Sequence, residues 1–437
     1  MIVVLLAVVL VITCAIHWYL WKRLVKDTTR TRRARRVGTA LAVLLALVIP
    51  ATLALSRALP HSRQALVAWP GFLWLALMFY LLVTLAMLEI PRLAVILWQR
   101  RSHSAALATA SAVGSGAAPS AGWGDSSDNR NVGFARREVA DKSETPGEAA
   151  VATVEPVAPV DARFNAGRRL LLGRSLAVTA GALSASAVGI GVFQAMGAPN
   201  LKRVPIRLAK LPASMDGFRI ALVSDIHLGP LLGRGHTERI VRMINAVDAD
   251  LVAVVGDLVD GSVAELGAAA EPLQDLRARH GSFFVTGNHE YFSGYQEWID
   301  EVNSLGVRVL RNERVDVQGL DLAGINDLSG AGVGDAPDFG KALDGRDAAR
   351  PVVLLAHQPV QAHEAARHGV DLQLSGHTHG GQMVPFNLLV GLQQPIVAGL
   401  GNVDGTQVYV TRGAGFWGPP VRFGAPPDIS VIELHGA

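Results

Sequence analysis

The sequence contains a single cysteine, Cys14, which lies within an apolar run. One thiol per chain excludes an internal disulfide framework and a zinc site built from several cysteines. Cysteine usage therefore says nothing about the redox compartment. Charged residues are also few, at 18%, whereas hydrophobic residues make up 50% of the chain and the mean hydropathy is +0.30. The hydrophobic fraction and the mean hydropathy are high for a purely soluble protein, and they predict a membrane portion.

Four apolar stretches are long enough for the roughly 20 helical residues that cross a bilayer. They cover residues 2–21, 37–59, 66–90 and 170–196. In the first stretch the basic residues follow the apolar run, which disfavours a cleaved signal peptide. We expect a three-helix transmembrane region at 1–99, a flexible linker rich in Ala, Ser, Gly and Pro at 100–166, a fourth transmembrane helix at 167–199 and a separate domain at 200–437.

Basic residues are concentrated beside particular apolar stretches. Residues 22–36 include eight Lys and Arg and one Asp, whereas the next short loop offers only Arg57 and Arg63. Because basic loops remain in the cytoplasm, we expect the linker inside and the domain at 200–437 outside the cytoplasm, in a multi-pass protein of the cell membrane. Arg168 and Arg169 fit either a cytoplasmic flank or an internal twin-arginine export signal. Both interpretations direct the domain outward.

Beyond residue 200, short apolar runs alternate with amphipathic ones. Buried strands are predicted at 218–223, 251–255, 283–285, 352–356 and 372–374, and helices at 236–246 and 295–305. The alternation predicts an α/β domain. Polar residues follow each predicted strand, and the carboxyl ends of strands are where open α/β sheets bind their ligands.

These polar residues carry carboxylate, amide and imidazole groups. They form the clusters Asp225-Ile226-His227, Gly256-Asp257, Gly287-Asn288-His289-Glu290, His357 and Gly376-His377-Thr378-His379. Oxygen and nitrogen donors of this kind suit Mn, Fe, Zn or Mg without selecting one of them. We expect two divalent metal ions, because a pair of cations can bind a phosphoryl oxygen and activate a water molecule together.

The ordered set DxH, GD, GNHE, H and GHTHGGQ resembles the signature of the calcineurin-like metallophosphoesterase superfamily. The tail VYVTRGAGFWGPPVRFGAPPDISVIEL is similar to its bacterial membrane-associated phosphodiesterase branch. The resemblance covers residues 200–437 and implies a four-layer α-β-β-α sandwich. It implies one metal held by Asp225, His227 and His379, a second held by Asn288, His357 and His377, a bridging Asp257, a phosphate-contacting general acid at His289, and a nucleophilic hydroxide between the metals.

The function implied by this resemblance is that of a membrane-anchored phosphodiesterase or phosphatase acting on a phosphate ester, with lipid-linked or nucleotide substrates favoured. Residues 200–437 carry 19 basic against 27 acidic residues, whereas residues 1–199 carry 21 against 10. Nucleic acid is therefore disfavoured as a partner, because it binds basic surfaces. The alternative is a non-catalytic docking protein that keeps the phosphoesterase fold, although the complete ligand set argues against it. The sequence does not specify an oligomeric state.

Several residues near the clusters have simpler interpretations. Glu290 is expected to orient a ligand rather than to bind metal, Asp327 to cap a loop, and His236 to lie on a surface or helix. The apolar segment 385–400 is expected in the core, with contact to the bilayer as the alternative.

Overall fold

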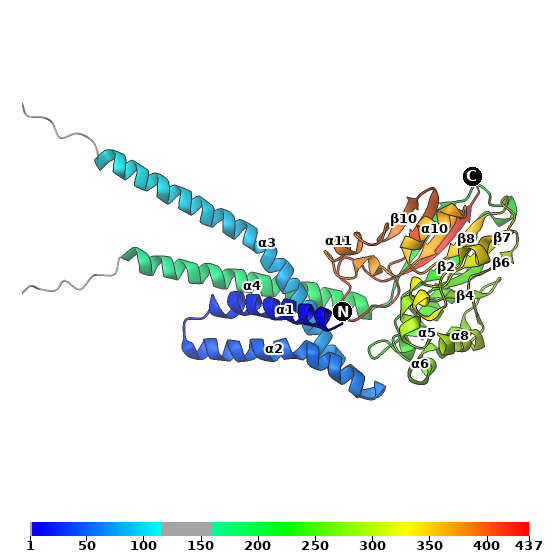
Figure 1. Cartoon of the computed structure of the whole chain (residues 1–437), viewed down its shortest axis with the longest axis horizontal. Coiled ribbons are helices and arrows are strands. Elements are labelled where there is room, and N and C mark those ends of the chain that lie inside the picture. Colours follow the sequence, from blue (N-terminus) through cyan, green and yellow to red (C-terminus); the bar gives the residue numbers. More distant parts are fainter. Residues whose placement is uncertain (1, 115–159, 437) are drawn as a thin grey trace, which may run out of the picture.

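The N-terminal half of the protein consists of long helices. The computed structural model describes residues 2–114 and 160–436. Its first helices are α1 (Ile2–Trp21), α2 (Arg32–Ala58), α3 (His61–Gly114) and α4 (Val160–Met196), with a π-helical turn at Lys22–Lys26. Most of the expected linker, 115–159, lies outside the described residues. The helices run side by side at one end of the molecule (Figure 1).

The number of membrane spans differs from expectation. Among the described residues, three helical segments are long and apolar enough to cross a membrane, rather than four: Arg32–Ser56, His61–Pro91 and Leu170–Met196. The first apolar stretch does form helix α1, but it is not one of the three, and the side chains of its first nine residues lie outside the described part of the chain.

Polar contacts join the helices within the bundle. The Arg23 guanidinium forms an ion pair with Glu89 of α3 at 2.6 Å, and the Thr84 and Ser184 hydroxyls share a hydrogen bond of 3.0 Å between α3 and α4. The Arg174 side chain donates to the Thr28 carbonyl oxygen. The basic segment after α1 therefore lies beside the N-terminal part of α4, far from the end at Met196 that leads into the next domain.

Two six-stranded sheets form the domain that follows α4. The first has the order β1-β12-β2-β3-β4-β5 and the second β10-β11-β9-β8-β7-β6. Their bounds are β1 (Asn200–Arg207), β2 (Phe218–Val223), β3 (Leu251–Val255), β4 (Ser282–Val285), β5 (Val307–Val309), β6 (Glu313–Val317), β7 (Leu320–Gly324), β8 (Val352–Leu355), β9 (Leu372–Ser375), β10 (Gly399–Val403), β11 (Thr406–Val410) and β12 (Asp428–His435). All five predicted strands are confirmed to within one residue at each end.

The sheets pack face to face and helices cover their outer faces. Side chains alternate between the two faces of β2, and both faces are apolar. Ile220 and Leu222 enter the core between the sheets, whereas Ala221 and Val223 face the helices. The covering helices are α5 (Arg234–Asn245), α6 (Val263–Ala270) and α8 (Tyr295–Ser304) on the first sheet, and α9 (Phe339–Leu343) and α10 (Ala362–Arg367) on the second. The short helix α7 (Asn288–Phe292) follows β4. Two mixed sheets flanked by helices agree with the expected sandwich.

The expectation that residues 385–400 belong to the core is wrong: among them only Gln394 is buried. Helix α11 (Asn387–Val390) has no buried residue, and Leu388, Leu389 and Leu392 are 69%, 57% and 83% exposed. Burial by protein and burial by lipid both favour apolar side chains. Composition alone could not distinguish the two.

The domain is joined closely to the bundle. Only three residues separate α4 from β1, and the Arg239 guanidinium of α5 donates to the carbonyl oxygens of Met196 and Gly197. Strand β1 pairs in parallel with β12, beginning with Asn200 opposite Asp428. The domain is thus tied to the end of α4 by a strand and by an arginine.

Candidate metal centre

Strained backbone at the ends of strands positions the predicted ligands. Asp225, His227, Asp257, His377 and His379 all have φ between 50° and 69°. This left-handed conformation is uncommon for residues other than glycine, costs about 1–3 kcal/mol each, and concentrates at functional sites. It turns each side chain inward at the point where its strand ends.

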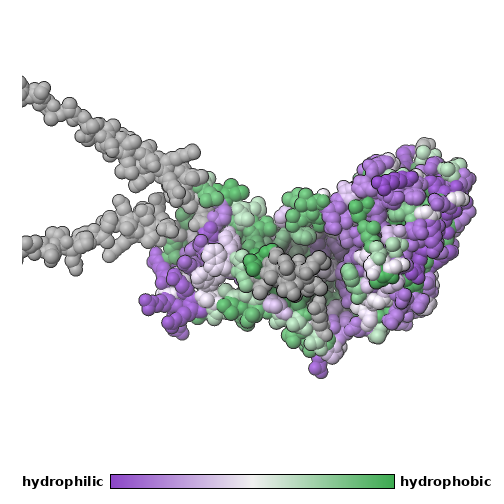
Figure 2. All heavy atoms as spheres, in the orientation of Figure 1, coloured by the Kyte–Doolittle hydropathy of each residue, from purple (hydrophilic) through white to green (hydrophobic). Residues whose placement is uncertain are grey.

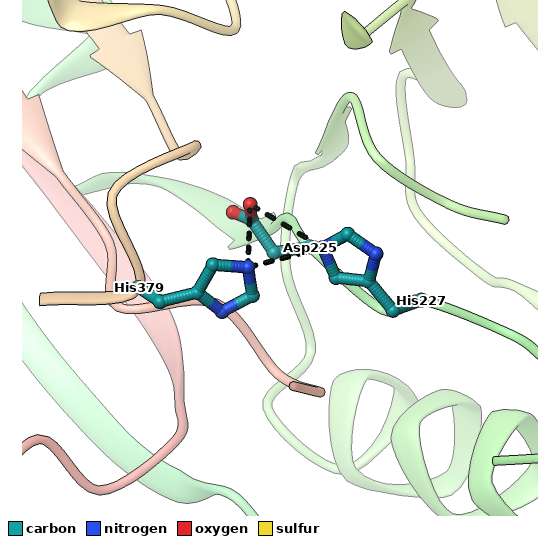
Figure 3. A group of neighbouring side chains, drawn as sticks. All are labelled: Asp225, His227 and His379. Carbon is teal, nitrogen blue, oxygen red and sulfur yellow. Dashed lines mark hydrogen bonds and ion pairs between the residues drawn. The ribbon is translucent and has the colours of Figure 1, made fainter. Parts of the chain in front are cut away.

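The first group of ligands gathers around Asp225. The Nε2 atoms of His227 and His379 lie 3.0 Å apart, at 4.0 and 3.4 Å from Asp225 Oδ1. Figure 3 shows the three side chains converging from two loops that are distant in sequence: Asp225 and His227 follow β2, and His379 follows β9. All three are buried.

The second group gathers around His377 and Asp257. His377 Nδ1 lies 3.0 Å from Asn288 Oδ1 and 3.3 Å from His357 Nε2. Asp257 Oδ2 lies 3.1 Å from His357 Nε2 and 3.7 Å from His227 Nε2, so it faces both groups. The structure therefore brings together all seven predicted ligands, with Asp257 between the two sets.

The chemistry of this donor set fits divalent cations. Two imidazole nitrogens at 3.0 Å, directed at each other beside a carboxylate, cannot both donate a proton comfortably, whereas both can direct lone pairs at one cation. Within residues 2–114 and 160–436, three groups of His, Asp or Glu could hold a metal ion, and they include six of the seven predicted ligands and His289. Oxygen and nitrogen donors without thiolate suit Mn, Fe, Zn or Mg.

Asp260 is a functional residue that the sequence reasoning missed. Its Oδ1 lies 3.1 Å from His227 Nδ1 and 2.6 Å from His289 Nδ1, so one carboxylate orients both imidazoles. His289 Nε2 remains on the side of the metal centre, 4.0 Å from Asp257 Oδ2. In the sequence, Asp260 is the last residue of GDLVD, three residues after Asp257. It was passed over because an aspartate there is also explained as an ordinary turn residue.

Burial and the neighbouring charges raise the pKa of some groups in the centre and lower the pKa of others. Burial alone lowers the pKa of His227, but Asp260, Asp257 and Asp225 outweigh burial and raise that pKa to about 9. Burial also acts on His377, where the neighbouring His357 reinforces it, and lowers the pKa to about 3. Burial opposes ionisation of Asp260, but His227 and His289 dominate and lower its pKa to about 2.

Two further buried carboxyl groups, those of Glu290 and Asp327, lie near the ligand loops. Glu290 accepts backbone N–H groups of Gly287, Asp257 and Leu258, so it positions a ligand loop as expected, and burial followed by the Asp257 charge raises its pKa to about 7. Asp327 accepts from the Ser329 N–H as the expected cap.

Arg422, also missed, is fully buried. Its guanidinium donates to His379 Nδ1 at 2.7 Å and to the carbonyl oxygens of Arg412, Gly415 and Ala425. His236 lies in helix α5, one of the two expected settings, and is buried there.

A two-sheet α/β sandwich whose strand ends present a histidine–aspartate cradle for metal defines the class of metallophosphoesterases. The family model described as calcineurin-like phosphoesterase matches residues 218–381. An uncharacterized metallophosphoesterase of Aquifex aeolicus is 34% identical over 54% of this chain and 92% of its own length. The chain belongs to the calcineurin-like phosphoesterase family.

Two further relatives match the same half of the chain. A metallophosphoesterase of Helicobacter pylori is 41% identical over 56% of this chain and 66% of its own length. A transmembrane protein with metallophosphoesterase domain from Danio rerio is 41% identical over 56% of this chain and 60% of its own. The chain thus spans less than two thirds of the length of these relatives. Among solved structures, a 5'-nucleotidase precursor from Thermus thermophilus has a TM-score of 0.30 at 15% identity, covering 50% of this chain and 54% of its own.

Proposed function

We propose that this protein is a membrane-anchored phosphoesterase that holds two divalent cations in the cradle and hydrolyses a phosphate ester. The observation that carries the proposal is the position of Asp257, whose Oδ2 faces His227 of one ligand group and His357 of the other. A carboxylate between two such groups is the arrangement that a pair of cations requires. Lipid-linked and nucleotide phosphate esters both fit a site held beside a membrane.

Two cations bound there supply Lewis acidity, lowering the pKa of a water molecule and neutralising charge on the phosphoryl oxygens. The chain's own residues divide the remaining work. Asp225, His227 and His379 would hold one cation, and Asn288, His357 and His377 would hold the other. His289 presents Nε2 to the site while Asp260 accepts from its Nδ1. Burial opposes protonation of His289, but Asp260 outweighs it and raises the pKa, so that Nε2–H can donate to the leaving oxygen.

The proposed topology places the basic residues after α1 in the cytoplasm and the catalytic domain outside it. Its support is the separation of the two ends of the bundle. The basic segment after α1 contacts the N-terminal part of α4, where Arg174 donates to the Thr28 carbonyl oxygen, whereas the catalytic domain follows Met196. Basic loops remain in the cytoplasm, so the domain at the opposite end lies outside. A reporter fused after the last residue, active only outside the cytoplasm, tests this orientation.

The activity is tested on the full chain in detergent with bis-p-nitrophenyl phosphate and p-nitrophenyl phosphate. We expect hydrolysis that a chelator abolishes and that added Mn, Fe, Zn or Mg restores. Asp257→Asn and His377→Ala are each expected to lower the rate by more than about 100-fold, because even residues behind the ligands contribute 10–100-fold. Asp248→Asn is the matched control, since Asp248 contacts only surface arginines in the described structure.

Activity that survives both ligand substitutions contradicts the proposal. Metal analysis provides the second criterion: protein purified without chelators and containing no divalent metal would instead favour the non-catalytic docking protein. These two measurements separate a hydrolase from a fold that has lost its chemistry.

A further inference from the structure

Helix α11 presents an exposed apolar face beside the metal centre. This α11 face consists of Phe386, Leu388, Leu389 and Leu392, which are 44% to 83% exposed. No Asp, Glu, Lys or Arg occurs between residues 383 and 400. Large exposed side chains gathered on one short segment, without any charge, are typical of a surface that is covered in use.

The α11 face continues directly from the membrane helices. The Phe386 ring meets Phe79 of α3 edge-on, with ring centroids 6.4 Å apart. Nearby, Phe423 meets Tyr80 at 5.6 Å, and the Arg422 N–H donates to the Gly191 carbonyl oxygen of α4. These helix residues belong to the candidate spans His61–Pro91 and Leu170–Met196.

The figures show the same continuity. Helix α11 lies at the edge of the catalytic domain nearest the helices (Figure 1). In Figure 2 a hydrophobic area on that edge of the domain lies close to the hydrophobic surface of the bundle, whereas the far end of the domain is mostly hydrophilic. A bilayer that surrounds the spans would therefore reach this edge first.

We propose that the α11 face rests in the surface of the lipid bilayer that surrounds the spans. Lipid is favoured over a protein partner because the face is contiguous with residues of the spans and offers no charge for a partner to pair. Uncharged apolar side chains enter the headgroup and acyl boundary without a desolvation penalty. The spans and the face then hold the catalytic domain in one orientation.

This orientation gives the substrate class, an inference that rests on the proposed function. Helix α11 packs directly on the ligand loop: a Cβ added to Gly381 would lie 2.4 Å from the Asn387 Cα. On the same side, Trp417 is 57% exposed and its ring lies 5.8 Å from that of His289. The centre is therefore positioned to take the phosphate ester of a bilayer lipid, whose tails remain in the membrane.

The chain's single cysteine makes the bilayer contact directly measurable. In a Cys14→Ser background, an environment-sensitive thiol probe is attached at Leu392→Cys in the full chain, reconstituted at one copy per nanodisc. The matched control is Ser304→Cys, an exposed position at the end of α8, a helix that lies away from the bundle (Figure 1).

We expect blue-shifted emission at position 392 and quenching by lipids that carry a nitroxide, with neither effect at position 304. Quenching of both positions by aqueous iodide, without quenching by the lipid nitroxide, overturns the proposal. Shielding at position 392 that requires several copies per disc assigns the face to a second copy and also overturns it.

The substrate class has its own test in Leu388→Ser with Leu392→Ser. We expect unchanged hydrolysis of soluble bis-p-nitrophenyl phosphate and a loss of hydrolysis of phosphatidic acid or phosphatidylglycerol in the nanodisc. Retention of full lipid hydrolysis overturns the lipid-substrate inference. A wild-type protein that hydrolyses neither ester contradicts the proposed function instead, and the probe experiment, which needs no activity, still decides whether the face meets lipid.

Discussion

Replacing Asp260 by Asn tests whether its carboxylate tunes the metal centre. The substitution keeps the size of the side chain but removes the charge that faces Nδ1 of both His227 and His289. The pKa of His227 is about 9 instead of 6.5, which corresponds to about 3 kcal/mol. Because Asp257 and Asp225 share this effect, the contribution of Asp260 is roughly 1–2 kcal/mol.

The Asp260 carboxylate favours both a proton and a metal ion on His227. Removing it weakens the attraction for the metal ion but also weakens binding of the proton that competes with the metal, so the two effects on metal affinity oppose each other. A divalent cation carries twice the charge of the proton that it displaces, and the metal therefore loses more. The net expectation for Asp260→Asn is metal binding weaker by about tenfold, within the 10–100-fold range known for residues that orient ligands.

The pH dependence gives a second readout, which a merely structural role would not change. A raised pKa means that the folded protein holds a proton up to about pH 9, so metal affinity in the wild type rises with pH until that value. In Asp260→Asn the rise should level off at lower pH. Chelator competition across pH 6 to 10 measures both effects, with Asp248→Asn as control. An unchanged dissociation constant and an unchanged pH profile would refute the reasoning.

Two further perturbations test the ligand loops and the buried histidine. Gly376→Ala would place a Cβ 1.9 Å from Ser224 Oγ and 2.3 Å from Asp225 Oδ2. We expect this variant to lose about 1–3 kcal/mol of stability and to bind metal more weakly in a metal titration. The control is Gly235→Ala, whose Cβ would meet nothing within 4 Å and which should bind metal normally. Burial lowers the pKa of His236 to about 4. Its contribution to the free energy of unfolding is therefore complete above pH 6.5 and is lost as pH falls toward 4, by about 3 kcal/mol. Urea unfolding at pH 7 and pH 4.5 should show this loss of stability, and an equal loss in His236→Gln would contradict its attribution to His236.

The sequence predicted five of the central strands, β2, β3, β4, β8 and β9, because burial on both faces leaves a continuous apolar run in each. Strands β2 and β3 match their predicted bounds, and every ligand follows such a strand. The strands that were missed contain charged or polar residues. They include the interior strands β7, β11 and β12 as well as the edge strands β1 and β6, which alternate charged with apolar residues and are largely half-buried or exposed. Their pairing depends on the neighbouring strand rather than on their own hydrophobicity.

The ligands were recognised by order and spacing, but their supporting residues were not. Asp260 and Arg422 act through the imidazoles that they contact, and those imidazoles come from segments far apart in the chain. Only the folded arrangement reveals such partners. The α11 face was ambiguous for a different reason, since hydrophobic composition does not distinguish a protein interior from lipid.

The pairing of β1 with β12 has a consequence for biosynthesis. Strand β1 follows the bundle directly. Its one neighbour among the described strands is β12, which comes more than two hundred residues later in the chain and pairs with β2 on its other side. During translation β1 therefore stays unpaired until β12 has been synthesised. A ribosome that stalled before Asp428 would leave β1 without its partner, and the incomplete domain would be joined to α4 by a strand that had not yet entered the sheet.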